Sequence, residues 1–349
     1  MSLFYKNKPI FGLEFSKTSI RVVSVDRSKM LVHGYGSIDL DPSKISDSLE
    51  ESHDYLVGKM SDLFQNNIVG KLGSNRAVLG VPAARTFART FTIPTNQEAN
   101  LKNAVNLEAE QYIPMPLESL YVDYQVIRRD KKEIMVLMCA IPKKFTDILL
   151  EAVNNSGVEV TMVEPSINAA ARLLEYTKEG GMPTIIVDIS PASTDIAVYD
   201  SAIRVTGGLN VGGNTFTLDI AKKMDIPLEN AHQLKVLSGM SAGPRQAKIT
   251  AALKPSLMRA VNETKKVIRF YTDRFPNEAK LEQVLIVGSG SNVPGLGEFF
   301  TNELIMPARV ASPWQALNFG ELSQPSKQMR PRFMGSAGLA LVNPGEIWK

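Results

Sequence analysis

The stretch Ile185-Ile-Val-Asp-Ile-Ser-Pro-Ala-Ser-Thr-Asp-Ile-Ala197 has the same pattern as an earlier one, Phe11-Gly-Leu-Glu-Phe-Ser-Lys-Thr-Ser-Ile-Arg-Val-Val23. In both, an apolar run leads to an acidic residue, Glu14 or Asp188, a short polar segment follows, and a second apolar run begins. Apolar runs with β-branched residues that are interrupted by turn residues predict a β-hairpin. The sequence therefore predicts two similar hairpins, one in each half of the chain.

A third apolar segment follows each predicted hairpin, His33–Ile38 in the first half and Ile203–Leu209 in the second. The chain has 349 residues, which is more than one ordinary core accommodates. We therefore expect an α/β fold of two duplicated lobes, each with its own sheet, and a cleft between them.

The symmetry is interrupted by residues 85–160, for which we expect an inserted α+β subdomain in the first lobe. Its predicted elements are strands Thr86–Ile93, Tyr121–Arg128 and Ile134–Ile141 and helices Asn96–Tyr112 and Lys143–Asn155. On the first of these helices we expect a partly amphipathic face of Leu101, Val105, Leu107, Glu108 and Tyr112.

The rest of the chain is divided between the two lobes. The first lobe is expected to comprise residues 1–84, 161–179 and 330–349, and the second lobe residues 180–213 and 276–329. Residues 214–275 are expected to form a helical side subdomain, with helices at Asn214–Met224, Leu228–Leu237 and Leu253–Tyr271.

The composition argues against several classes of protein. There are 39 basic and 36 acidic residues, and the basic ones are scattered, so we expect no binding of nucleic acid. With Cys139 as the single cysteine, neither a disulfide framework nor a cysteine metal site can be built, which favours a reducing compartment. Residues 1–10 lack the apolar stretch of a signal peptide, and no run of about 18 apolar residues occurs. We expect a cytoplasmic protein that reaches a membrane only through a partner.

The two predicted turns are candidate phosphate sites, because a tight turn concentrates backbone amides on one point. The first turn offers Ser16, Lys17, Thr18 and Ser19, and the second offers Ser190, Ser193 and Thr194. A single turn of this kind is often hairpin chemistry alone. Two similar turns facing one cleft are more informative, since they could hold phosphates from opposite sides.

The acidic residues before the turns are candidate metal ligands. Glu14 and Asp188 could hold a hydrated Mg²⁺ against phosphate oxygens. The alternative is that each carboxylate caps its own turn by accepting backbone N–H bonds. Later in the chain, the predicted strand Leu281–Val287 leads into Gly288, Ser289, Gly290 and Ser291, where amides at a helix start could hold an anion or a ribose.

The order of these features is similar to that of the actin-like ATPase superfamily, with its ribonuclease H-like duplicated lobes. Within it the chain resembles the PilM family, the FtsA-like proteins of type IV pilus assembly, over essentially its whole length. The similarity is carried by Glu108-Ala-Glu-Gln-Tyr-Ile-Pro-Met-Pro116 with Tyr121-Val-Asp-Tyr-Gln125, by Val163-Glu-Pro-Ser-Ile-Asn-Ala-Ala170, and by Val287-Gly-Ser-Gly-Ser-Asn-Val-Pro-Gly-Leu296.

The resemblance implies ATP with Mg²⁺ in the cleft, its phosphates at the two turns and its adenosine against Gly288–Ser291. It also implies that Lys235 contacts the nucleoside and that Gly212, Gly213 and Asn214 approach the nucleotide through backbone amides, although Gly-Gly could simply end a strand. Glu164 is the candidate to orient an attacking water. Its alternative role is that of an acid stabilised by a helix N-terminus.

The chain departs from the family pattern at Ser16 and Ser190, where relatives carry glycine. A serine side chain could narrow the site or donate its own hydroxyl. Weak ATPase activity and binding of ATP without hydrolysis are therefore both open.

As a family member, the chain is expected to be a cytoplasmic scaffold at the inner membrane that binds the N-terminal cytoplasmic tail of a PilN-like membrane protein, with pilus motor ATPases as further candidate partners. The tail is expected to dock near Arg85–Ile93. A small-molecule kinase and an FtsA-like filament-forming protein are the alternatives. The first lacks a dedicated catalytic base, and for the second Val342–Lys349 is too short and Pro-broken for an amphipathic membrane helix.

Overall fold

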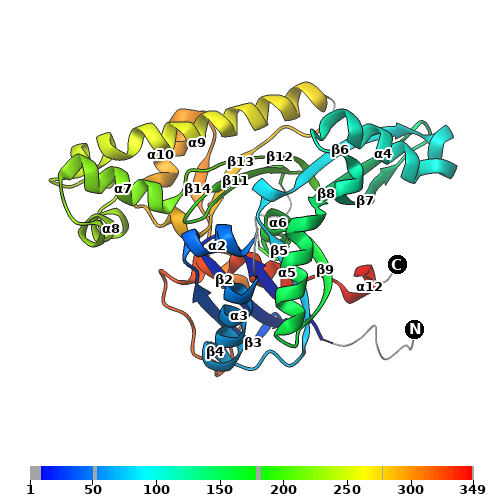
Figure 1. Cartoon of the computed structure of the whole chain (residues 1–349). Coiled ribbons are helices and arrows are strands. Elements are labelled where there is room, and N and C mark those ends of the chain that lie inside the picture. Colours follow the sequence, from blue (N-terminus) through cyan, green and yellow to red (C-terminus); the bar gives the residue numbers. More distant parts are fainter. Residues whose placement is uncertain (1–8, 50–52, 178–181, 277, 348–349) are drawn as a thin grey trace.

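The computed structural model describes residues 9–49, 53–177, 182–276 and 278–347. Residues 1–8, part of the segment from which we expect no export signal, and residues 348–349 lie outside the described part. The chain forms two lobes built on two sheets, with the N-terminal sheet below and the second sheet above in Figure 1.

The first sheet has six strands in the order β4-β3-β2-β1-β5-β9. Its strands are β1 (Phe11–Phe15), β2 (Ser19–Asp26), β3 (Leu31–Asp39), β4 (Ile68–Gly70), β5 (Arg76–Val81) and β9 (Glu159–Pro165). β1 pairs antiparallel with β2 and parallel with β5. The first predicted hairpin and its third strand are confirmed.

The second sheet has eight strands in the order β14-β13-β10-β11-β12-β6-β8-β7. Its strands are β6 (Phe87–Pro94), β7 (Leu120–Arg129), β8 (Glu133–Pro142), β10 (Thr184–Ile189), β11 (Thr194–Tyr199), β12 (Ile203–Leu209), β13 (Gln283–Val287) and β14 (Ala308–Val310). β10 pairs antiparallel with β11 and parallel with β13, which repeats the arrangement around β1. The second hairpin is confirmed too.

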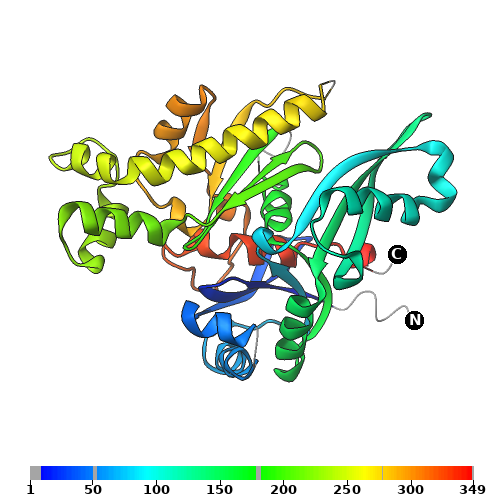
Figure 2. The same ribbon diagram turned by 45° about the horizontal axis from the view of Figure 1, so that its top comes forward.

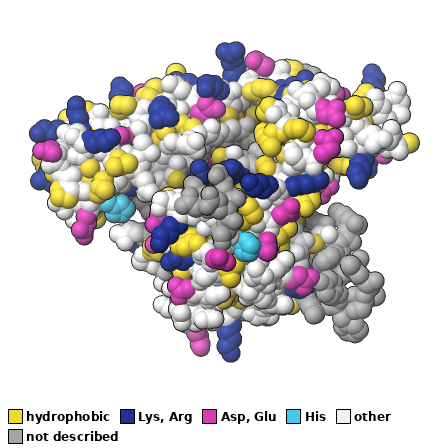
Figure 3. Space-filling view, in the orientation of Figure 1, with side chains coloured by type: hydrophobic (Ala, Val, Ile, Leu, Met, Phe, Trp, Pro, Cys, Tyr) yellow, Lys and Arg dark blue, Asp and Glu magenta, His cyan; other side chains and the backbone are white. Residues whose placement is uncertain are grey.

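Helices cover the outer faces of both sheets. Beside the first sheet lie α2 (Pro42–Ser48), α3 (Asp54–Asn66) and α5 (Lys143–Asn155), and the second lobe carries α7 (Gly213–Met224), α8 (Leu228–Leu237), α9 (Gln246–Arg274) and α10 (Leu296–Leu304). The long α9 runs along the top of the second lobe (Figure 1). In Figure 3, both basic and acidic side chains lie on the face shown.

The two sheets are joined by two helices, α6 (Ser166–Glu175) and α11 (Met334–Ala340). One apolar cluster contains side chains of both sheets and of both helices, among them Val23 of β2, Leu173 of α6, Ile186 of β10 and Ala337 of α11. α11 consists largely of small residues, and a Cβ on Gly338 would lie 1.9 Å from the carbonyl oxygen of Ala169. The absence of side chains here lets α11 lie directly against α6, so the lobes share one packed junction.

The segment after β5 passes from the first sheet to the second and forms a projection, seen at the right of Figure 2. After the short 3₁₀ turn η1 (Ala83–Arg85), β6, β8 and β7 pair antiparallel, and α4 (Leu101–Tyr112) packs on them. Short 3₁₀ turns η2 (Thr95–Asn100) and η3 (Leu117–Ser119) flank α4. β6 pairs in register with β12 at Val205 and Arg89, and the hydroxyls of Thr90 and Thr206 donate to carbonyl oxygens of the opposite strand.

Three details of the sequence-based expectations are corrected by the structure. α4 starts at Leu101 after a 3₁₀ turn, and Leu107 is 63% exposed, because the buried face of the helix consists of Leu101, Ala104, Val105 and Ala109. Helix α5 packs into the core of the first lobe through Phe145 and Leu149 and not against α4. In each case the packing partner decides which side chains are buried: β6, β7 and β8 for α4, and the core of the first lobe for α5.

Helix α9 begins at Gln246, seven residues before the predicted start at Leu253, and contains Pro255. A proline removes one helical hydrogen bond and strains the preceding turn. The residues before it are held by burial of Ile249 and Ala252 in the core of the second lobe. The tertiary contacts thus offset the local cost of the proline.

Candidate functional site

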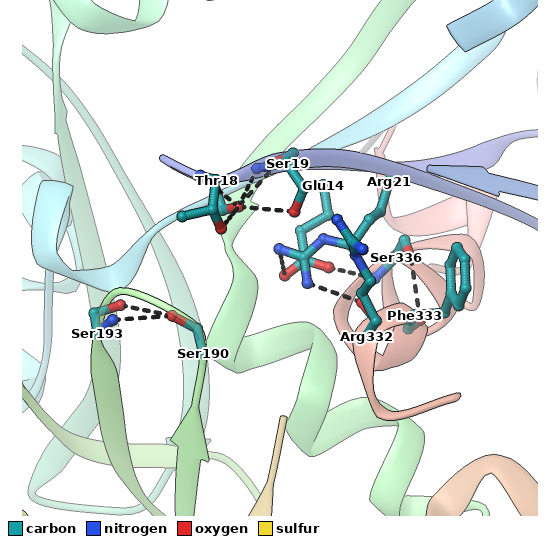
Figure 4. A network of polar contacts seen from close by, with 10 residues as sticks. Glu14, Thr18, Ser19, Arg21, Ser190, Ser193, Arg332, Phe333 and Ser336 are labelled. Atoms are coloured by element: carbon teal, nitrogen blue, oxygen red, sulfur yellow. Dashed lines mark hydrogen bonds and ion pairs between the residues drawn. The ribbon is translucent and has the colours of Figure 1, made fainter. Parts of the chain in front are cut away.

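A cavity of about 280 Å³ lies where the two hairpin turns face each other across the junction of the lobes. Figure 4 shows Thr18 and Ser19 of the first turn on one side and Ser190 and Ser193 of the second turn on the other. The predicted site residues that line this cavity are Glu14, Ser16, Lys17, Thr18, Asp188, Ser190, Ser193, Gly288 and Ser289. The structure therefore brings together three segments that are far apart in the sequence.

The first turn is closed by its own serine. The backbone N–H of Ser16 donates to the carbonyl oxygen of Ser19 at 3.0 Å. In return, the Ser16 hydroxyl oxygen accepts the N–H of Ser19 at 3.1 Å and lies 3.4 Å from the amide nitrogen of Thr18. The amides that we expected to hold a phosphate are thus satisfied by the Ser16 side chain, as in a serine turn.

The second turn repeats this geometry. The N–H of Ser190 donates to the carbonyl oxygen of Ser193 at 2.8 Å, and the Ser190 hydroxyl oxygen accepts the N–H of Ser193 at 3.1 Å. Ser16 and Ser190 occupy equivalent positions, each two residues after its acidic residue. The similarity that the sequence suggested extends to individual hydrogen bonds.

Glu14 is held by groups of other elements. One carboxylate oxygen lies 3.6 Å from the Arg21 guanidinium, and the other accepts the N–H of Ser336 at 3.0 Å. Arg21 is the residue directly opposite Glu14 on β2, so both side chains lie on the same face of the sheet. Glu14 does not cap its own turn, and its charge is already paired.

The second lobe carries two carboxylates at the equivalent positions. Asp188 lies directly opposite Asp195 on β11, and both line the cavity. Burial, together with the nearby charge of Glu14 and Asp195, raises the pKa of Asp188 to about 7. Burial also raises the pKa of Asp195 to about 7, although a hydrogen bond from the backbone N–H of Ala83 partly offsets the rise. The first lobe thus pairs an acid with a base, whereas the second pairs two acids.

This pair of carboxylates is the part of the site best suited to a cation. The Oδ1 atom of Asp195 is buried and has no hydrogen-bond partner in the described part of the chain. Mg²⁺ is commonly bound by one or two carboxylates, water and substrate phosphates. Within the same residues, no group of three or more acidic, histidine or cysteine side chains could enclose an ion. A cation here would therefore depend on water and on phosphate oxygens for its other ligands.

The glycine loop after β13 packs directly on the second turn. Gly288 has φ +85°, and a Cβ at this position would lie 2.1 Å from Asp188 Oδ1, so only glycine fits there. Gly288 and Ser289 line the cavity. Ser291 is turned inward, and its hydroxyl donates to the carbonyl oxygen of Gly288 at 2.6 Å.

Lys235 lies beyond this loop, behind the start of α7. Its ammonium group donates to the carbonyl oxygen of Gly213 at 2.8 Å and to the Thr217 hydroxyl at 2.9 Å. A Cβ on Gly213 would lie 3.0 Å from the Cα of Gly290 and 3.6 Å from the Lys235 Nζ. Burial lowers the pKa of Lys235 to about 8. The structure therefore gathers Lys235, Gly213 and Gly290 beside the loop, outside the cavity itself.

Several predicted site residues have other roles in the structure. The N–H groups of Gly213 and Asn214 donate to the carbonyl oxygens of Ser190 and Pro191, so these amides support the second turn. Position 212 requires glycine, because a Cβ there would lie 2.4 Å from the Ser190 carbonyl oxygen. Ser19 and Thr194 are buried, and the Thr194 hydroxyl donates to the carbonyl oxygen of Val211. None of these five lines the cavity of the described chain.

Glu164 is not placed to orient a water molecule. Its two carboxylate oxygens accept hydrogen bonds from the Arg172 guanidinium at 2.7 and 2.9 Å, and the same guanidinium donates to the Gly338 carbonyl oxygen. Glu164 is 4% exposed and does not line the cavity. Its observed contact is with Arg172, which links β9 to α6, and Arg172 in turn reaches α11 at the Gly338 carbonyl oxygen. The alternative role, an acid stabilised by the start of the helix, stays a prediction.

The sequence analysis missed Asp195, Arg21, Arg85 and Asn210, all of which line the cavity. A signal for the first two was present. In these hairpins Asp195 lies opposite Asp188, and Arg21 lies opposite Glu14. Residues directly opposite each other on paired strands have their side chains on the same face of the sheet, so the partner of an acid that faces the cavity must face the cavity too. Arg85 and Asn210 arrive from η1 and from the end of β12, which no local pattern connects to the turns.

A second cavity, of about 580 Å³, opens between β6, β12, α9 and the end of α4. We call it the β6/β12 groove. Its wall includes Phe87, Met138, Gly207, Gly208 and Phe270. Arg89 crosses it, with its guanidinium carbon 3.5 Å from the centre of the Tyr112 ring and 4.9 Å from that of Phe270. This groove lies at the predicted docking segment Arg85–Ile93.

Comparisons with known proteins agree with this architecture. The family model described as "Type IV pilus assembly protein PilM" matches residues 12–343. Among solved structures, the "PilM-PilN type IV pilus biogenesis complex" has a chain that superposes with a TM-score of 0.79 at 21% identity, covering 96% of this chain and 98% of that one. MreB5 of Spiroplasma citri bound to AMPPNP superposes with a TM-score of 0.52 at 13% identity, over 98% and 96% of the chains. The fold is therefore the two-lobed actin-like ATPase fold.

Among curated proteins, the cell division protein FtsA of Neisseria meningitidis is 28% identical over 201 residues, which are 51% of this chain and 46% of that protein. The chain thus spans about half the length of this FtsA. In the described residues, no helix combines the length and the apolar character needed to cross a bilayer.

Proposed function

The chain belongs to the PilM family of type IV pilus assembly proteins, and from this premise we propose that it is a scaffold that binds Mg-ATP between its lobes and the N-terminal tail of a PilN-like membrane protein. Its role is in pilus assembly. The observation that carries the nucleotide claim is the pair of equivalent serine turns that face one carboxylate-lined cavity.

The phosphates would lie in the cavity between the turns, near Lys17 and Arg85. Mg²⁺ would be held, largely through water, by Asp188 and Asp195, because a cation would offset the repulsion between these two facing carboxylates and would give the unpartnered Oδ1 of Asp195 a partner. Glu14 fits the metal role less well, since Arg21 already pairs with it. The nucleoside would extend past Ser289 toward Gly213 and Lys235.

We propose binding with little hydrolysis. A water-orienting group must reach the attacking water by hydrogen bond. Glu164 is engaged by Arg172, and the turn amides are engaged by Ser16 and Ser190. Nucleotide would then act as a structural or switching ligand.

Calorimetric titration with Mg-ATP, followed by an assay of phosphate release, tests this proposal. We expect heat of binding and slow or no release of phosphate. The absence of heat would refute the proposal that the chain binds Mg-ATP. Fast release of phosphate would refute the proposal that ATP is bound with little hydrolysis. An Asp188→Asn variant should weaken binding of Mg-ATP more than binding of ATP in the presence of EDTA.

The β6/β12 groove is the proposed site for the tail. β6 and β12 share one register pair, Arg89 with Val205, and two side-chain hydrogen bonds, from Thr206 to the Ala88 carbonyl oxygen and from Thr90 to the Ile203 carbonyl oxygen. Most of their facing backbone groups are therefore not paired with each other where the strands line the groove. An extended peptide could add to such unpaired strand edges and place alternate side chains in the apolar wall. Through this tail the protein would be peripheral to the cytoplasmic face of the inner membrane.

A pull-down with a synthetic copy of the tail of the PilN-like protein tests this site. Phe270 lines the groove and is 40% exposed, so Phe270→Ala should weaken tail binding at least several-fold. Leu218 on α7 is 43% exposed and outside the groove, so Leu218→Ala serves as the matched control. Equal binding by both variants and the parent protein would place the tail elsewhere.

A further inference from the structure

Helix α9 carries a large share of the chain's positive charge. It contains seven basic and two acidic residues, whereas the whole chain has 39 basic and 36 acidic residues. Acidic residues therefore outnumber basic ones in the rest of the chain. All seven basic residues of α9 are exposed: Lys248, Lys254, Arg259, Lys265, Lys266, Arg269 and Arg274.

The first six of these residues lie on the side of the helix that points away from the core, since successive residues of a helix are turned by about 100°. The opposite side buries Ile249, Leu253 and Val261 in the core of the second lobe. Figure 1 shows α9 along the top of this lobe, and Figure 3 shows Lys and Arg side chains along the same upper edge of the molecule. We call this exposed side of α9, with its six cations, the α9 basic face.

Acidic neighbours offset the charge of this face only in part. Glu263 Oε2 lies 2.8 Å from the Lys266 ammonium group, and Asp273 Oδ2 lies 3.8 Å from the Arg269 guanidinium. The Lys266 and Arg269 side chains are 73% and 86% exposed, and ion pairs this exposed to water are weak. The face therefore keeps a net positive charge.

The α9 basic face also contains a hollow of about 420 Å³. It is lined by Lys265, Lys266, Arg269, Phe270 and Asp273. The three cations suit the phosphate of a lipid head group, and the exposed ring of Phe270 suits the apolar layer directly beneath it. The same chemistry occurs on helices that lie flat on anionic membranes.

The β6/β12 groove opens at the same helix. Lys266 and Phe270 line both the groove and the hollow. The tail of a membrane protein seated in the groove would therefore hold α9 beside the bilayer from which that tail emerges.

We propose that the α9 basic face lies on the anionic lipid surface of the membrane. The inference rests on the proposed function for the tail that brings the chain to the membrane, and it adds a direct contact that orients the chain there. At 1.5 Å per residue, the 29-residue helix is about 40 Å long, and a row of cations of this length on an outer helix matches a broad, nearly flat anionic surface. An acidic peptide would need a groove that follows the row.

The test measures sedimentation of the full chain, without any tail peptide, with vesicles of phosphatidylcholine alone or with about 30% phosphatidylglycerol. We expect binding at least about ten-fold tighter to the anionic vesicles, and loss of this difference at high salt, which screens exposed charges. Equal binding to both kinds of vesicle would overturn the proposal.

A triple variant, Arg259→Gln with Lys265→Gln and Arg269→Gln, tests the assigned face. None of the three lines the β6/β12 groove. Each cation near an anionic bilayer strengthens binding about five-fold, so the variant should bind anionic vesicles at least about ten-fold more weakly. The matched control removes three exposed cations of the first lobe, by Arg27→Gln, Lys29→Gln and Lys44→Gln, and should bind within two-fold of the wild type.

Equal losses in the two triple variants would overturn the assignment to α9. Binding of polyglutamate that is lost in the α9 variant, without binding of anionic vesicles, would overturn it in favour of an acidic protein partner. Pull-down with the synthetic tail separates this inference from the proposed function, because the α9 variant should retain tail binding. A wild type that binds anionic vesicles but no tail would refute the proposed tail site and leave the lipid contact supported.

Discussion

Replacing Asp195 with asparagine should make the nucleotide-free protein more stable, and increasingly so as the pH rises. Burial raises the pKa of Asp195 from 3.8 to about 7 in the folded protein. The native state therefore keeps its proton up to a higher pH than the unfolded chain does. Between about pH 4 and pH 7 unfolding releases a proton, so the free energy of unfolding falls as the pH rises, and the loss is complete above pH 7.

The size of this effect can be estimated from the shift. One pKa unit corresponds to about 1.4 kcal/mol, so the shift corresponds to about 4 kcal/mol at pH 8 and to less than half of that at pH 5. Asparagine does not titrate, and its amide can donate toward Asp188. For a chain of this length, about 2 to 4 kcal/mol corresponds to an increase in Tm of roughly 3 to 6 °C at pH 8.

Thermal unfolding of the wild type and of Asp195→Asn, each at pH 5 and pH 8, measures this directly. Asp273→Asn is the matched control, because Asp273 is exposed on α9 and outside the nucleotide cavity. A gap in Tm that does not widen from pH 5 to pH 8 would refute the argument. A variant that is more stable yet binds Mg-ATP as tightly as the wild type would refute the cation role of Asp195.

Three further predictions concern the glycine loop, the second turn and the buried ion pair of Glu164. Gly288→Ala should lower the free energy of unfolding by about 2 to 3 kcal/mol, because the new side chain has φ +85° and clashes with Asp188. Gly73→Ala is the control: Gly73 has φ +71° but open space around it, so this variant should lower the free energy of unfolding by about 1 kcal/mol. Chemical denaturation of both variants measures the difference. Ser190→Gly should tighten nucleotide binding several-fold, because it frees the Ser193 N–H, and weaker binding in calorimetry would contradict this. Arg172→Met should cost about 3 kcal/mol of stability by leaving Glu164 buried without its partner, while Glu164→Gln should cost less, and equal losses would count against a buried ion pair.

The hairpins and their third strands could be predicted because they depend on neighbours in the sequence. Apolar runs, an acid and a serine turn are sufficient to specify each unit, and the hydrogen bonds of Ser16 and Ser190 stay within three residues. The predicted first residues of helices α4 and α9 differed from the observed ones. α9 continues through the positions before Pro255 because Ile249 is buried against other elements.

The site could be predicted only in part. Asp195 was recoverable from strand register, but Arg85 and Asn210 reach the cavity through the path of the chain between sheets. Glu164 shows the opposite error. Its position before a helix agreed with a catalytic role, yet Arg172, eight residues later, takes up both of its oxygens.

By itself, the sequence determined the two matched turns, the acids that precede them and the family to which the chain belongs, because these features are written in contiguous residues. The tertiary structure decided which groups are available for chemistry. Availability depends on charges and amides supplied by distant segments: Arg21 and Ser336 satisfy Glu14, whereas Asp195 faces Asp188 and keeps an unpartnered oxygen. The lobes differ because the buried acid of the first lobe, Glu14, is paired with a base, whereas that of the second lobe, Asp188, faces a second acid. Packing buries these groups away from water, and burial is what makes two facing carboxylates energetically unfavourable.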